Sequence, residues 1–586
     1  MITRDSIKRA AKNPGLVQSF SGVRAKFGQG PEIPDDLEAL ALAYGFCYAK
    51  NVLQGRQEAE ILIGRDPRPT GESLAEALAR GFLAGAAVQN CRLKIVNLDI
   101  ITTPLIETAV RTLQPAGGVM ITASHNPLTD NGFKFITGYS KPGDSDKQDA
   151  PPGALLSASR MGKIVSDVRE LIESPEEFIS AVERIDDGSF AHAFGNGEDH
   201  ERRIKAERAY LDAIGEDWGI KPHCLKPLVF GPVVLDPNGG AACGIGARVL
   251  EHFGVRAIEV NAELGYPEHG IDTDNIDPAS GKHMLIRTAR AALRNGARFG
   301  IAFDYDADRG NMVLPGLDES AIIPPQKVAT TNIALALTHR ETLGEKRGKL
   351  AVVISDSTSG ASAEVARMFG AEVFIVETGE INVVTKMHQL RAEGYDVPIG
   401  VEGANGGSIF GASTCRDGLQ TAICAALADE NPELADHWQK VLCRNNNSAG
   451  TCELRRLPDI VAAVPTYFNR VFRFEGPDIS HSEIKSRMEE HFKHGIWQKI
   501  SNKFDSYEFE DYEGTSRVKS RTGDESGGWR VAFYSKAGKS FIFARGSRTE
   551  AGIWRVIIDT PDASVGDALV EAGKAIYEAA TKESGC

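Results

Sequence analysis

Short apolar runs of strand length alternate with helix-like segments over the first two thirds of the chain. The strand-like runs cover residues 61–64, 93–98, 117–122, 227–236, 299–304, 350–355 and 371–376. Helical segments at 73–87, 244–254 and 361–370 lie between them, and the last two end on glycine, as helix C-termini often do. This alternation predicts doubly wound, largely parallel α/β sheets.

The pattern changes towards the end of the chain. Residues 539–559 contain two β-runs on either side of a polar loop, which predicts an α+β domain unlike those before it. Residues 140–160 are rich in Pro, Gly, Ser and Asp and predict a loop or insertion, and the polar residues 502–530 predict a long connection in the last domain. No strong short-period repeat occurs in the sequence. The alternating elements therefore only suggest that the three α/β segments are copies of one structural design.

The length of 586 residues is too great for one hydrophobic core and suggests about four domains at roughly 150 residues each. No run of 18 apolar residues occurs, so no transmembrane helix is expected, and the N-terminus lacks an apolar secretory segment. We place α/β domains I, II and III at residues 1–200, 201–316 and 317–440, and an α+β domain IV at 441–586.

The net charge of −14 argues against a nucleic-acid partner, which needs a basic surface. Small anionic ligands stay possible, because a cleft can be locally positive in an acidic protein. The nine cysteines are scattered without a CxxC pair, so neither a zinc site nor a redox motif is predicted. We expect a cytoplasmic protein with reduced thiols and no membrane partner, present as a monomer or homodimer.

The first candidate loop is TASHNP, which directly follows the strand-like run 117–122. Ser124 is therefore expected at the carboxyl end of a strand, the edge where open α/β sheets bind ligands. A hydrolase nucleophile elbow requires G-x-S-x-G, and the neighbours of Ser124, among them Ala123 and His125, do not match it. On its own, this serine is most simply a turn residue.

The second loop, DYDADR, places Asp304, Asp306 and Asp308 at i, i+2 and i+4 just beyond a strand. Carboxylates this close repel one another unless a cation or proton intervenes, and an all-oxygen ligand set favours Mg²⁺. An EF-hand is excluded, because Arg309 stands at its glycine position and Pro315 at its glutamate position. Arg309 suits a phosphate that bridges to the ion, which argues against a merely solvated acidic turn.

Two glycine-containing loops complete the polar pattern. Glu402 begins a glycine-rich turn whose backbone can approach a ligand closely, and a carboxylate there can accept two sugar hydroxyls; a tight structural loop is equally compatible. The loop 544–552 would hold a small anion such as phosphate, the alternative being a solvated hairpin tip. Its donors are Arg545, Ser547, Arg548 and Thr549. Together, the four loops predict phosphoryl transfer on a phosphorylated sugar.

With these motifs in this order from residue 19 to residue 555, the chain resembles the α-D-phosphohexomutases, the phosphoglucomutase/phosphomannomutase superfamily. TASHNP is similar to the phosphoserine loop of that family, DYDADR to its D-G-D-x-D-R metal loop, and ARGSRTEAG to its phosphate loop. SFSGVRA (19–25) and GRDPRPTG (64–71) are similar to two motifs of its first domain. The resemblance implies four domains around a central cleft: three similar doubly wound α/β domains and a smaller α+β domain.

The resemblance also implies roles for individual residues. Ser124 would be phosphorylated in the active enzyme, and Mg²⁺ would be bound by the three aspartates and a phosphoserine oxygen. Arg24 and Lys134 would lie near the transferred phosphoryl group and assist proton transfer. We keep His125 among the candidate catalytic residues, although not as a hydrolase base. The candidate substrate-binding residues are Arg309, Thr378, Gly379, Glu402, Asn405, Arg545, Ser547 and Thr549.

The chain departs from the family pattern at several of these positions. The sugar loop lacks the usual serine, so Asn405 either replaces that hydroxyl contact or the contact is lost. A similar loop occurs in some phosphoglucosamine mutases. Tyr305 replaces the glycine of the metal loop, which restricts the backbone there. In the phosphate loop, Gly546, Arg548 and Ala551 replace Pro, Gly and Pro.

The expected activity is the interconversion of hexose 1-phosphate and hexose 6-phosphate, with glucose or mannose as the sugar. Phospho-Ser124 would donate its phosphoryl group, and the hexose 1,6-bisphosphate formed would turn around before returning a phosphoryl group. A phosphoglucosamine mutase of the same family is the main alternative. A hydrolase is disfavoured by the closed, dry cleft expected for the family. A non-catalytic sugar-phosphate-binding protein is disfavoured by the intact serine and aspartates.

Overall fold

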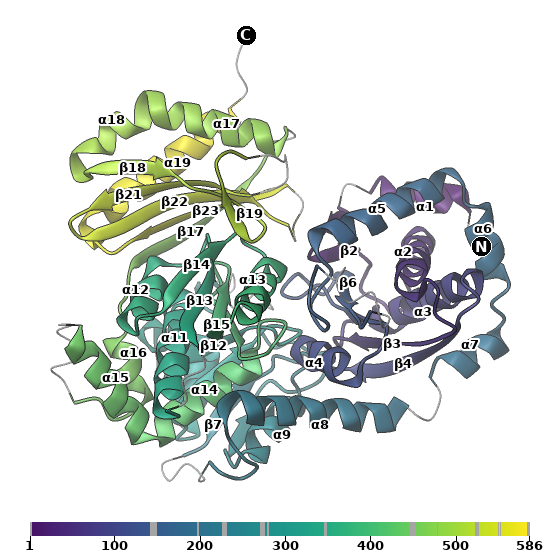
Figure 1. Cartoon of the computed structure of the whole chain (residues 1–586), viewed down its shortest axis with the longest axis horizontal. Coiled ribbons are helices and arrows are strands. Elements are labelled where there is room, and N and C mark those ends of the chain that lie inside the picture. Colours follow the sequence, from purple (N-terminus) through teal and green to yellow (C-terminus); the bar gives the residue numbers. More distant parts are fainter. Residues whose placement is uncertain are drawn as a thin grey trace. The chain divides into compact units, whose positions relative to one another are not determined.

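The computed structural model describes residues 3–13, 15–140, 149–195, 199–225, 231–269, 276–277, 281–344, 348–445, 453–477, 479–521, 527–548, 550 and 552–582. They form two compact units, of which unit 1 comprises residues 1–322 with 412–422 and unit 2 comprises residues 323–411 with 423–586. Each unit combines sheets with covering helices, as Figure 1 shows. The predicted α/β fold class is therefore confirmed.

A six-stranded sheet forms the first part of unit 1, in the order β1-β2-β6-β5-β3-β4. Strand β3 runs parallel to β4 and β5, whereas β6 pairs antiparallel with β5 and β2. The strands are β1 (Val17–Ser19), β2 (Gly22–Lys26), β3 (Glu58–Arg65), β4 (Arg92–Ile100), β5 (Gly117–Ile121) and β6 (Asp130–Thr137). The helices are α1 (Arg4–Ala11), α2 (Asp35–Leu53), α3 (Gly71–Val88), α4 (Thr103–Leu113), α5 (Ala158–Glu173), α6 (Glu176–Glu183), α7 (Asp187–Ala193) and α8 (Asp199–Trp218).

Helices α2 and α3 pack closely because both carry glycine at their contact. A Cβ atom on Gly81 would overlap the carbonyl of Leu42, and one on Gly45 would overlap the carbonyl of Leu78. The two backbones can approach only without those side chains. Acidic residues in the first turn of α2, among them Asp35 and Asp36, also stabilise this helix, because their negative charges interact favourably with the positive end of the helix dipole.

A second, four-stranded sheet completes unit 1 in the order β12-β11-β7-β8. Strand β7 is parallel to β8 and β11, and β12 is antiparallel to β11. Helix α8 packs against α4 and β4 of the first sheet, where Arg203 donates to the carbonyl of Ile100 (2.9 Å). The elements are β7 (Val233–Asp236), α9 (Ile245–His252), β8 (Ala257–Glu259), β9 (Ile276–Asp277), β10 (Lys282–His283), α10 (Ile286–Arg294), β11 (Gly300–Phe303) and β12 (Gly310–Val313).

Unit 2 begins with a third sheet, in the order β14-β13-β15-β16. Strand β13 is parallel to β14 and β15, and β16 is antiparallel to β15. The elements of this part are α11 (Pro325–Thr342), β13 (Lys349–Ser355), α12 (Gly360–Met368), β14 (Glu372–Val376), α13 (Glu380–Ala392), β15 (Tyr395–Glu402), β16 (Gly407–Phe410), α15 (Pro432–Arg444) and α16 (Leu457–Ala463). Helix α14 (Gly418–Glu430) begins in unit 1 and continues into unit 2 from residue 423.

One four-strand design occurs in all three α/β sheets. In the orders β4-β3-β5-β6, β8-β7-β11-β12 and β14-β13-β15-β16, three parallel strands are followed by one antiparallel strand. The design that the sequence only suggested is therefore confirmed. A short hairpin connection joins the third and fourth strands each time: residues 122–129, 304–309 and 403–406. Three of the four candidate loops lie at this equivalent position.

The last part of unit 2 is a five-stranded antiparallel sheet in the order β17-β23-β22-β21-β18. Figure 1 shows its helices gathered on one face, where Trp529, Trp554 and Phe492 are fully or almost fully buried. The predicted α+β arrangement is confirmed. The elements are β17 (Phe468–Glu475), α17 (His481–His491), α18 (Trp497–Ile500), β18 (Ser506–Phe509), β21 (Trp529–Ser535), β22 (Gly538–Gly546), β23 (Ile553–Thr560) and α19 (Gly566–Thr581).

The prediction of a long connection over residues 502–530 is wrong. This segment contains β18, a separate hairpin of β19 (Asp511–Glu513) and β20 (Ser516–Val518), and the start of β21. Its strands are short and largely polar, so tertiary pairing rather than local apolar pattern determines them. Of the predicted loop 140–160, residues 141–148 lie outside the described residues, and helix α5 begins at Ala158.

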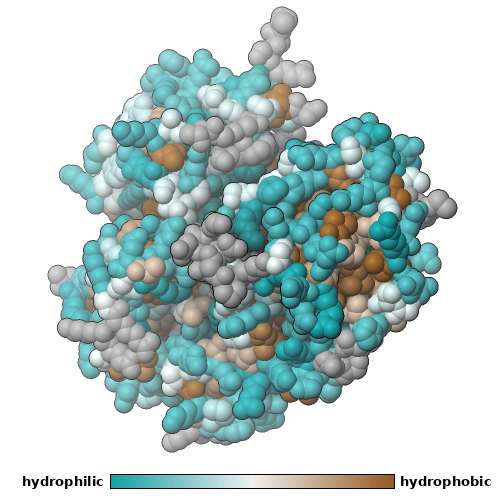
Figure 2. Space-filling view, turned by 45° about the vertical axis from the view of Figure 1, so that its right-hand side comes forward, coloured by the Kyte–Doolittle hydropathy of each residue, from teal (hydrophilic) through white to brown (hydrophobic). Residues whose placement is uncertain are grey.

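The face drawn in Figure 2 is mainly hydrophilic. Exposed large apolar side chains include Tyr266, Leu317 and Val471. No helix within the described ranges is long and apolar enough to cross a membrane. The boundaries of the four domains that we placed from the sequence stay a prediction.

Candidate active site

Ser124 lies just beyond β5 of the first sheet, in an unusual backbone conformation. Its φ of 52° is in the left-handed region, which residues with a side chain seldom adopt. Thr122 holds this turn: its hydroxyl donates to Asp66 (2.7 Å) and accepts a hydrogen bond from the Ser124 amide (2.8 Å). Such local strain, kept in place by buried hydrogen bonds, is typical of functional sites.

Arg68 shapes the rest of the serine loop. Its side chain is fully buried, and Nε donates to Asp66 (3.1 Å). Its two terminal nitrogens donate to the main-chain carbonyls of Ser124, Asn126, Pro127 and Asp130, at 2.5 to 2.8 Å. We did not single out Arg68 from the sequence, although it lies in the GRDPRPTG motif that the resemblance had marked.

Arg68→Lys is expected to destabilise the first sheet and loosen the serine loop, at a cost of about 2–4 kcal/mol, because an ammonium cannot serve five acceptors in the geometry of a planar guanidinium. Thermal unfolding and limited proteolysis within residues 122–130 would measure this. The control is Arg92→Lys, since the Arg92–Glu58 ion pair is largely exposed and contributes little. Equal Tm shifts in the two variants would contradict the assigned role.

The serine and aspartate loops meet at the Ser124 hydroxyl. This hydroxyl donates to Oδ2 of Asp304 (3.1 Å) and accepts from Nη2 of Arg309 (3.2 Å). His125 Nδ1 lies 3.4 Å from the same oxygen. Two loops 180 residues apart in sequence are thus joined through the atom on which the proposed chemistry depends.

The aspartate triad is buried and surrounded by cations. Ligand atoms of Asp304, Asp306 and Asp308 lie within 4.8 Å of one another. Lys134 Nζ is 2.9 Å from Oδ2 of Asp306 and 3.3 Å from Oδ2 of Asp308. Arg416 also donates to Asp308 (2.6 Å), a contact that no pattern around Arg416 in the sequence had indicated.

The triad fits a hard divalent cation such as Mg²⁺. All three groups offer carboxylate oxygens, the ligands that Mg²⁺ prefers. Oδ1 of Asp306 is buried and accepts no hydrogen bond from the described residues, so a ligand position is available there. Tyr305 does not disturb the loop, because the left-handed residue is Ala307 (φ 58°) and the buried Tyr305 ring lies 5.4 Å from the Arg68 guanidinium carbon.

Burial and neighbouring charges shift the ionisation of this site. Burial and the nearby Asp308 carboxylate raise the pKa of Asp304 well above its usual range. Burial also disfavours charge on Asp308, but Arg416, Lys134 and Arg309 lower its pKa below the usual value. Burial lowers the pKa of Arg24 to about 10, so its guanidinium stays positive near neutral pH. Nε and Nη1 of Arg24 have no hydrogen-bond partner among the described residues, as expected of donors awaiting an anion.

In unit 2, Thr378 and Gly379 lie between β14 and helix α13. The Thr378 hydroxyl donates to Asp356 (2.6 Å), which also accepts the Thr378 amide (2.9 Å). Burial raises the pKa of Asp356 to about 6. Gly379 has a φ of 145°, which favours glycine, and it caps the N-terminus of α13.

The Glu402 loop follows β15 at the position equivalent to the serine and aspartate loops. Glu402 is nearly buried, and Asn405 is half-buried at the turn. Gln326 donates to the carbonyls of Gly403 (2.9 Å) and Ala404 (2.7 Å) and so holds the turn. These hydrogen bonds fix the shape of the loop, which a site that recognises the positions of sugar hydroxyl groups requires.

The phosphate-loop candidates lie at the end of β22. Arg545 is nearly buried and forms an ion pair with Glu377 (3.0 Å). The Ser547 hydroxyl accepts from Arg555 (3.2 Å) and from the amide of Glu550 (3.2 Å). Thr549 lies outside the described residues.

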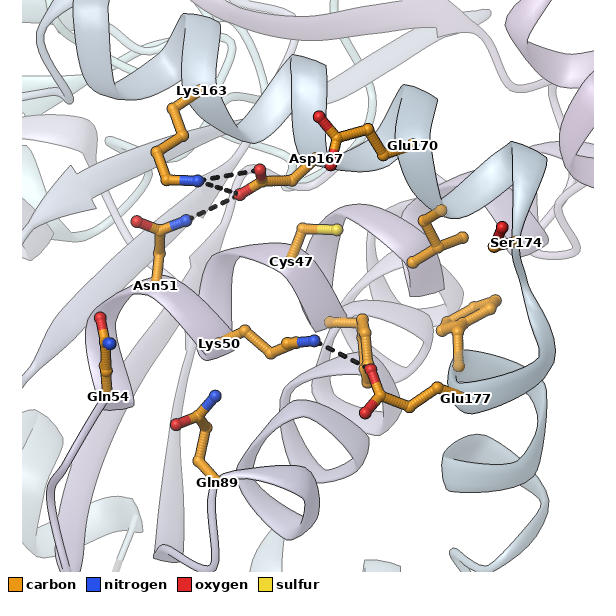
Figure 3. Close-up of a pocket in the computed structure, with 13 residues that line it drawn as sticks. Cys47, Lys50, Asn51, Gln54, Gln89, Lys163, Asp167, Glu170, Ser174 and Glu177 are labelled. Atoms are coloured by element: carbon orange, nitrogen blue, oxygen red, sulfur yellow. Dashed lines mark hydrogen bonds and ion pairs between the residues drawn. The ribbon is translucent and has the colours of Figure 1, made fainter.

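A separate cavity of 440 Å³ lies between α2, α5 and α6, and no described candidate residue lines it. Figure 3 shows two ion pairs in it, between Lys163 and Asp167 and between Lys50 and Glu177 (2.9 Å each). Burial raises the pKa of the Cys47 thiol to about 12, which leaves it unreactive. We assign no chemistry to this cavity.

The chain matches two descriptions of one protein family. Residues 17–150 match "Phosphoglucomutase/phosphomannomutase, alpha/beta/alpha domain I", and residues 330–442 match domain III of the same family. A phosphoglucosamine mutase from Cupriavidus metallidurans is 30% identical over 292 residues, which are 50% of this chain and 55% of the relative. One from Nocardia farcinica is 28% identical over 404 residues, which are 68% and 77% of the two chains. The chain spans about half the length of the first curated relatives that it matches.

Solved structures agree in fold. A phosphoglucomutase/phosphomannomutase family protein from Burkholderia thailandensis superposes with a TM-score of 0.62 at 16% identity, and the match covers 100% of this chain and 99% of the other. The matched domains occur in the order of the family, and the overall fold is shared. Residues 17–150 and 330–442 are therefore domains I and III of the phosphoglucomutase/phosphomannomutase family, and the whole chain has the fold of a member of that family.

Proposed function

We propose that the protein is a phosphohexomutase that interconverts the 1- and 6-phosphates of a hexose through phospho-Ser124. We propose glucosamine phosphate as the preferred substrate, because the two curated relatives described above are named phosphoglucosamine mutase. The comparisons favour this alternative over the glucose or mannose preference expected from the sequence.

The observation that carries the proposal is the position of the Ser124 hydroxyl. It lies 3.1 Å from Asp304 and 3.2 Å from Arg309, on a backbone held in a strained conformation. A turn serine needs neither a buried carboxylate triad nor an arginine at its hydroxyl. A serine that carries a phosphoryl group needs both negative ligands for a cation and positive donors for its own oxygens.

The residues around Ser124 can perform the transfer. The bond between phosphorus and the Ser124 oxygen breaks as a bond to the attacking sugar hydroxyl forms, and that hydroxyl loses its proton. We assign this proton to the imidazole of His125, which lies 3.4 Å from the Ser124 oxygen and can pass the proton to that oxygen once the phosphoryl group has left. The Lys134 ammonium, together with Arg24 and Arg309, would stabilise the charge of the phosphoryl oxygens. Bound Mg²⁺, held by Asp304, Asp306 and Asp308, would add positive charge next to the phosphoryl oxygens.

The residues of unit 2 are assigned to recognition of the substrate. Glu402 and Asn405, with Thr378 and Gly379, would contact the hydroxyl or amino groups of the sugar. Arg545, Ser547 and Thr549 would hold the phosphate that is not reacting. A bisphosphate intermediate requires such a second anion site, because either of its phosphates has to be held while the other reacts.

A coupled assay with glucosamine 1-phosphate, glucose 1-phosphate and mannose 1-phosphate, each with a trace of the matching 1,6-bisphosphate, tests the proposal. Formation of the 6-phosphates is expected, with the highest kcat/KM for glucosamine 1-phosphate. Release of inorganic phosphate without a 6-phosphate would indicate a hydrolase. Tight binding without turnover would indicate a sugar-phosphate-binding protein, and either result would contradict the proposed function.

A further inference from the structure

The β19–β20 hairpin belongs to the segment that the sequence did not explain, and it lies beside β14 of the third sheet. Two hydrogen bonds join the hairpin tip to Glu377, the residue after β14. The Glu377 amide donates to the carbonyl of Gly514 (3.0 Å), and the Gly514 amide donates back to Oε2 of Glu377 (2.8 Å). The φ of 56° at Gly514 allows the tight turn that presents this amide.

The second carboxylate oxygen of Glu377 makes two further contacts. Oε1 accepts from the amide of Gly527 (3.1 Å) and from Nη2 of Arg545 (3.0 Å). Gly514 and Gly527 lie at the hairpin tip and just before β21, so one nearly buried carboxylate joins this segment at two points to the arginine of the phosphate loop. Charge-assisted hydrogen bonds of this kind are strong and directional.

Arg545 continues the connection to the turn of Thr378 and Gly379. Its Nη1 donates to the main-chain carbonyl of Thr378, the residue next to Glu377. Thr378 is in turn held by Asp356, whose carbonyl accepts from Arg530. Arg530 also forms a buried ion pair with Glu510 (3.1 Å), which precedes the hairpin. The hairpin, the turn of Thr378 and Gly379 and the phosphate-loop arginine thus form one hydrogen-bonded assembly within unit 2.

We propose that the β19–β20 hairpin is a positioning element for substrate binding and that Glu377 is the positioning residue through which it acts. Glu377 would orient the Arg545 guanidinium and the Thr378 main chain for the sugar phosphate, which rests on the proposed function. A guanidinium held by two partners loses little further side-chain entropy when it binds phosphate. This arrangement would assist ground-state and transition-state binding equally, since Arg545 holds the phosphate that is not reacting.

Glu377→Gln tests this role, because glutamine keeps the shape but loses the charge and one acceptor. The expected result is a KM for the hexose 1-phosphate raised about tenfold or more, with kcat within about twofold of the wild type. In proteins that also carry Ser124→Ala, the affinity for glucosamine 6-phosphate, measured by calorimetry, should fall by a similar factor. Glu377→Asp, which restores the charge, should recover part of the loss.

The matched control is Glu372→Gln on the same strand β14, where the carboxylate pairs with the largely exposed Lys349. This variant should keep the KM of the wild type. An unchanged KM and affinity in Glu377→Gln, with an active wild type, would overturn the inference. The inference would also be overturned if KM rose and kcat fell by the same factor while the Tm decreased, because that result would indicate a merely structural role.

The calorimetric measurement also separates the two proposals. If the wild type turned over none of the sugar phosphates, the proposed mutase function would fail. A loss of sugar-phosphate affinity in Glu377→Gln would then still support the positioning role, and unchanged affinity would refute it.

Discussion

Ser124→Ala lowers turnover of the hexose phosphate by at least about 10⁴-fold and leaves the protein folded; this is the largest effect that we expect. The variant lacks the oxygen that would carry the phosphoryl group, and no other residue in the described part of the chain stands in its place between Asp304 and Arg309. Alanine removes only a hydroxyl, while Thr122 and Arg68 still hold the main chain of the loop. The coupled assay measures the activity, and circular dichroism with thermal unfolding measures the fold.

A second measurement makes this prediction specific to a phosphoryl carrier. Incubation with hexose 1,6-bisphosphate should add one phosphoryl group to the wild type, detectable by mass spectrometry on the peptide that contains Ser124, and none to the variant. Ser320→Ala, at an exposed serine of unit 1, should keep full activity and labelling. Near-normal activity in Ser124→Ala would refute the carrier role.

Asp306→Asn is expected to lower kcat/KM by about 10³-fold or more and to weaken Mg²⁺ binding at least about 100-fold. The change is isosteric, but it removes the negative charge from the group whose Oδ1 has no hydrogen-bond donor in the described part of the structure. A neutral amide oxygen is a poorer ligand for a hard divalent cation than a carboxylate. Calorimetric titration with Mg²⁺ in the absence of substrate measures the binding without reference to activity.

The metal dependence has its own control. Asp318→Asn, at an exposed aspartate of the same unit, should change neither Mg²⁺ affinity nor turnover. Removal of the metal with a chelator should abolish the activity of the wild type, and added Mg²⁺ should restore it. Full Mg²⁺ affinity and activity in Asp306→Asn would show that the triad is not the metal site.

Much of the fold could be predicted from the sequence because strand-like and helical periodicities are local. The runs at 117–122 and 299–304 became β5 and β11, and the chemically suggestive residues followed them directly. The repeated sheet design could only be suggested, because the relation lies in strand order and direction rather than in recurring residues. The polar β19 and β20 escaped detection because their stability comes from pairing and from contacts with β14.

The site was predictable where several reactive residues share one short loop, as the three aspartates do. Residues that act through distant partners were not. Arg68 holds carbonyls about 60 residues away, and Arg416 contacts Asp308 across 108 residues. An isolated arginine in sequence is usually a solvated surface residue, so nothing local distinguished Arg416 from the others. The motif around Arg68 did not indicate which carbonyls that arginine holds.

The shared hairpin position also bears on how such a protein can diverge. Each of the loops 122–129, 304–309 and 403–406 joins two adjacent antiparallel strands, so its ends are set by the sheet and not by the loop itself. Substitutions or insertions between those ends leave strand pairing intact. If the two loops have the proposed roles, substitutions at 403–406 could change sugar selectivity without altering the phosphoryl carrier at 122–129, so the two properties could evolve independently.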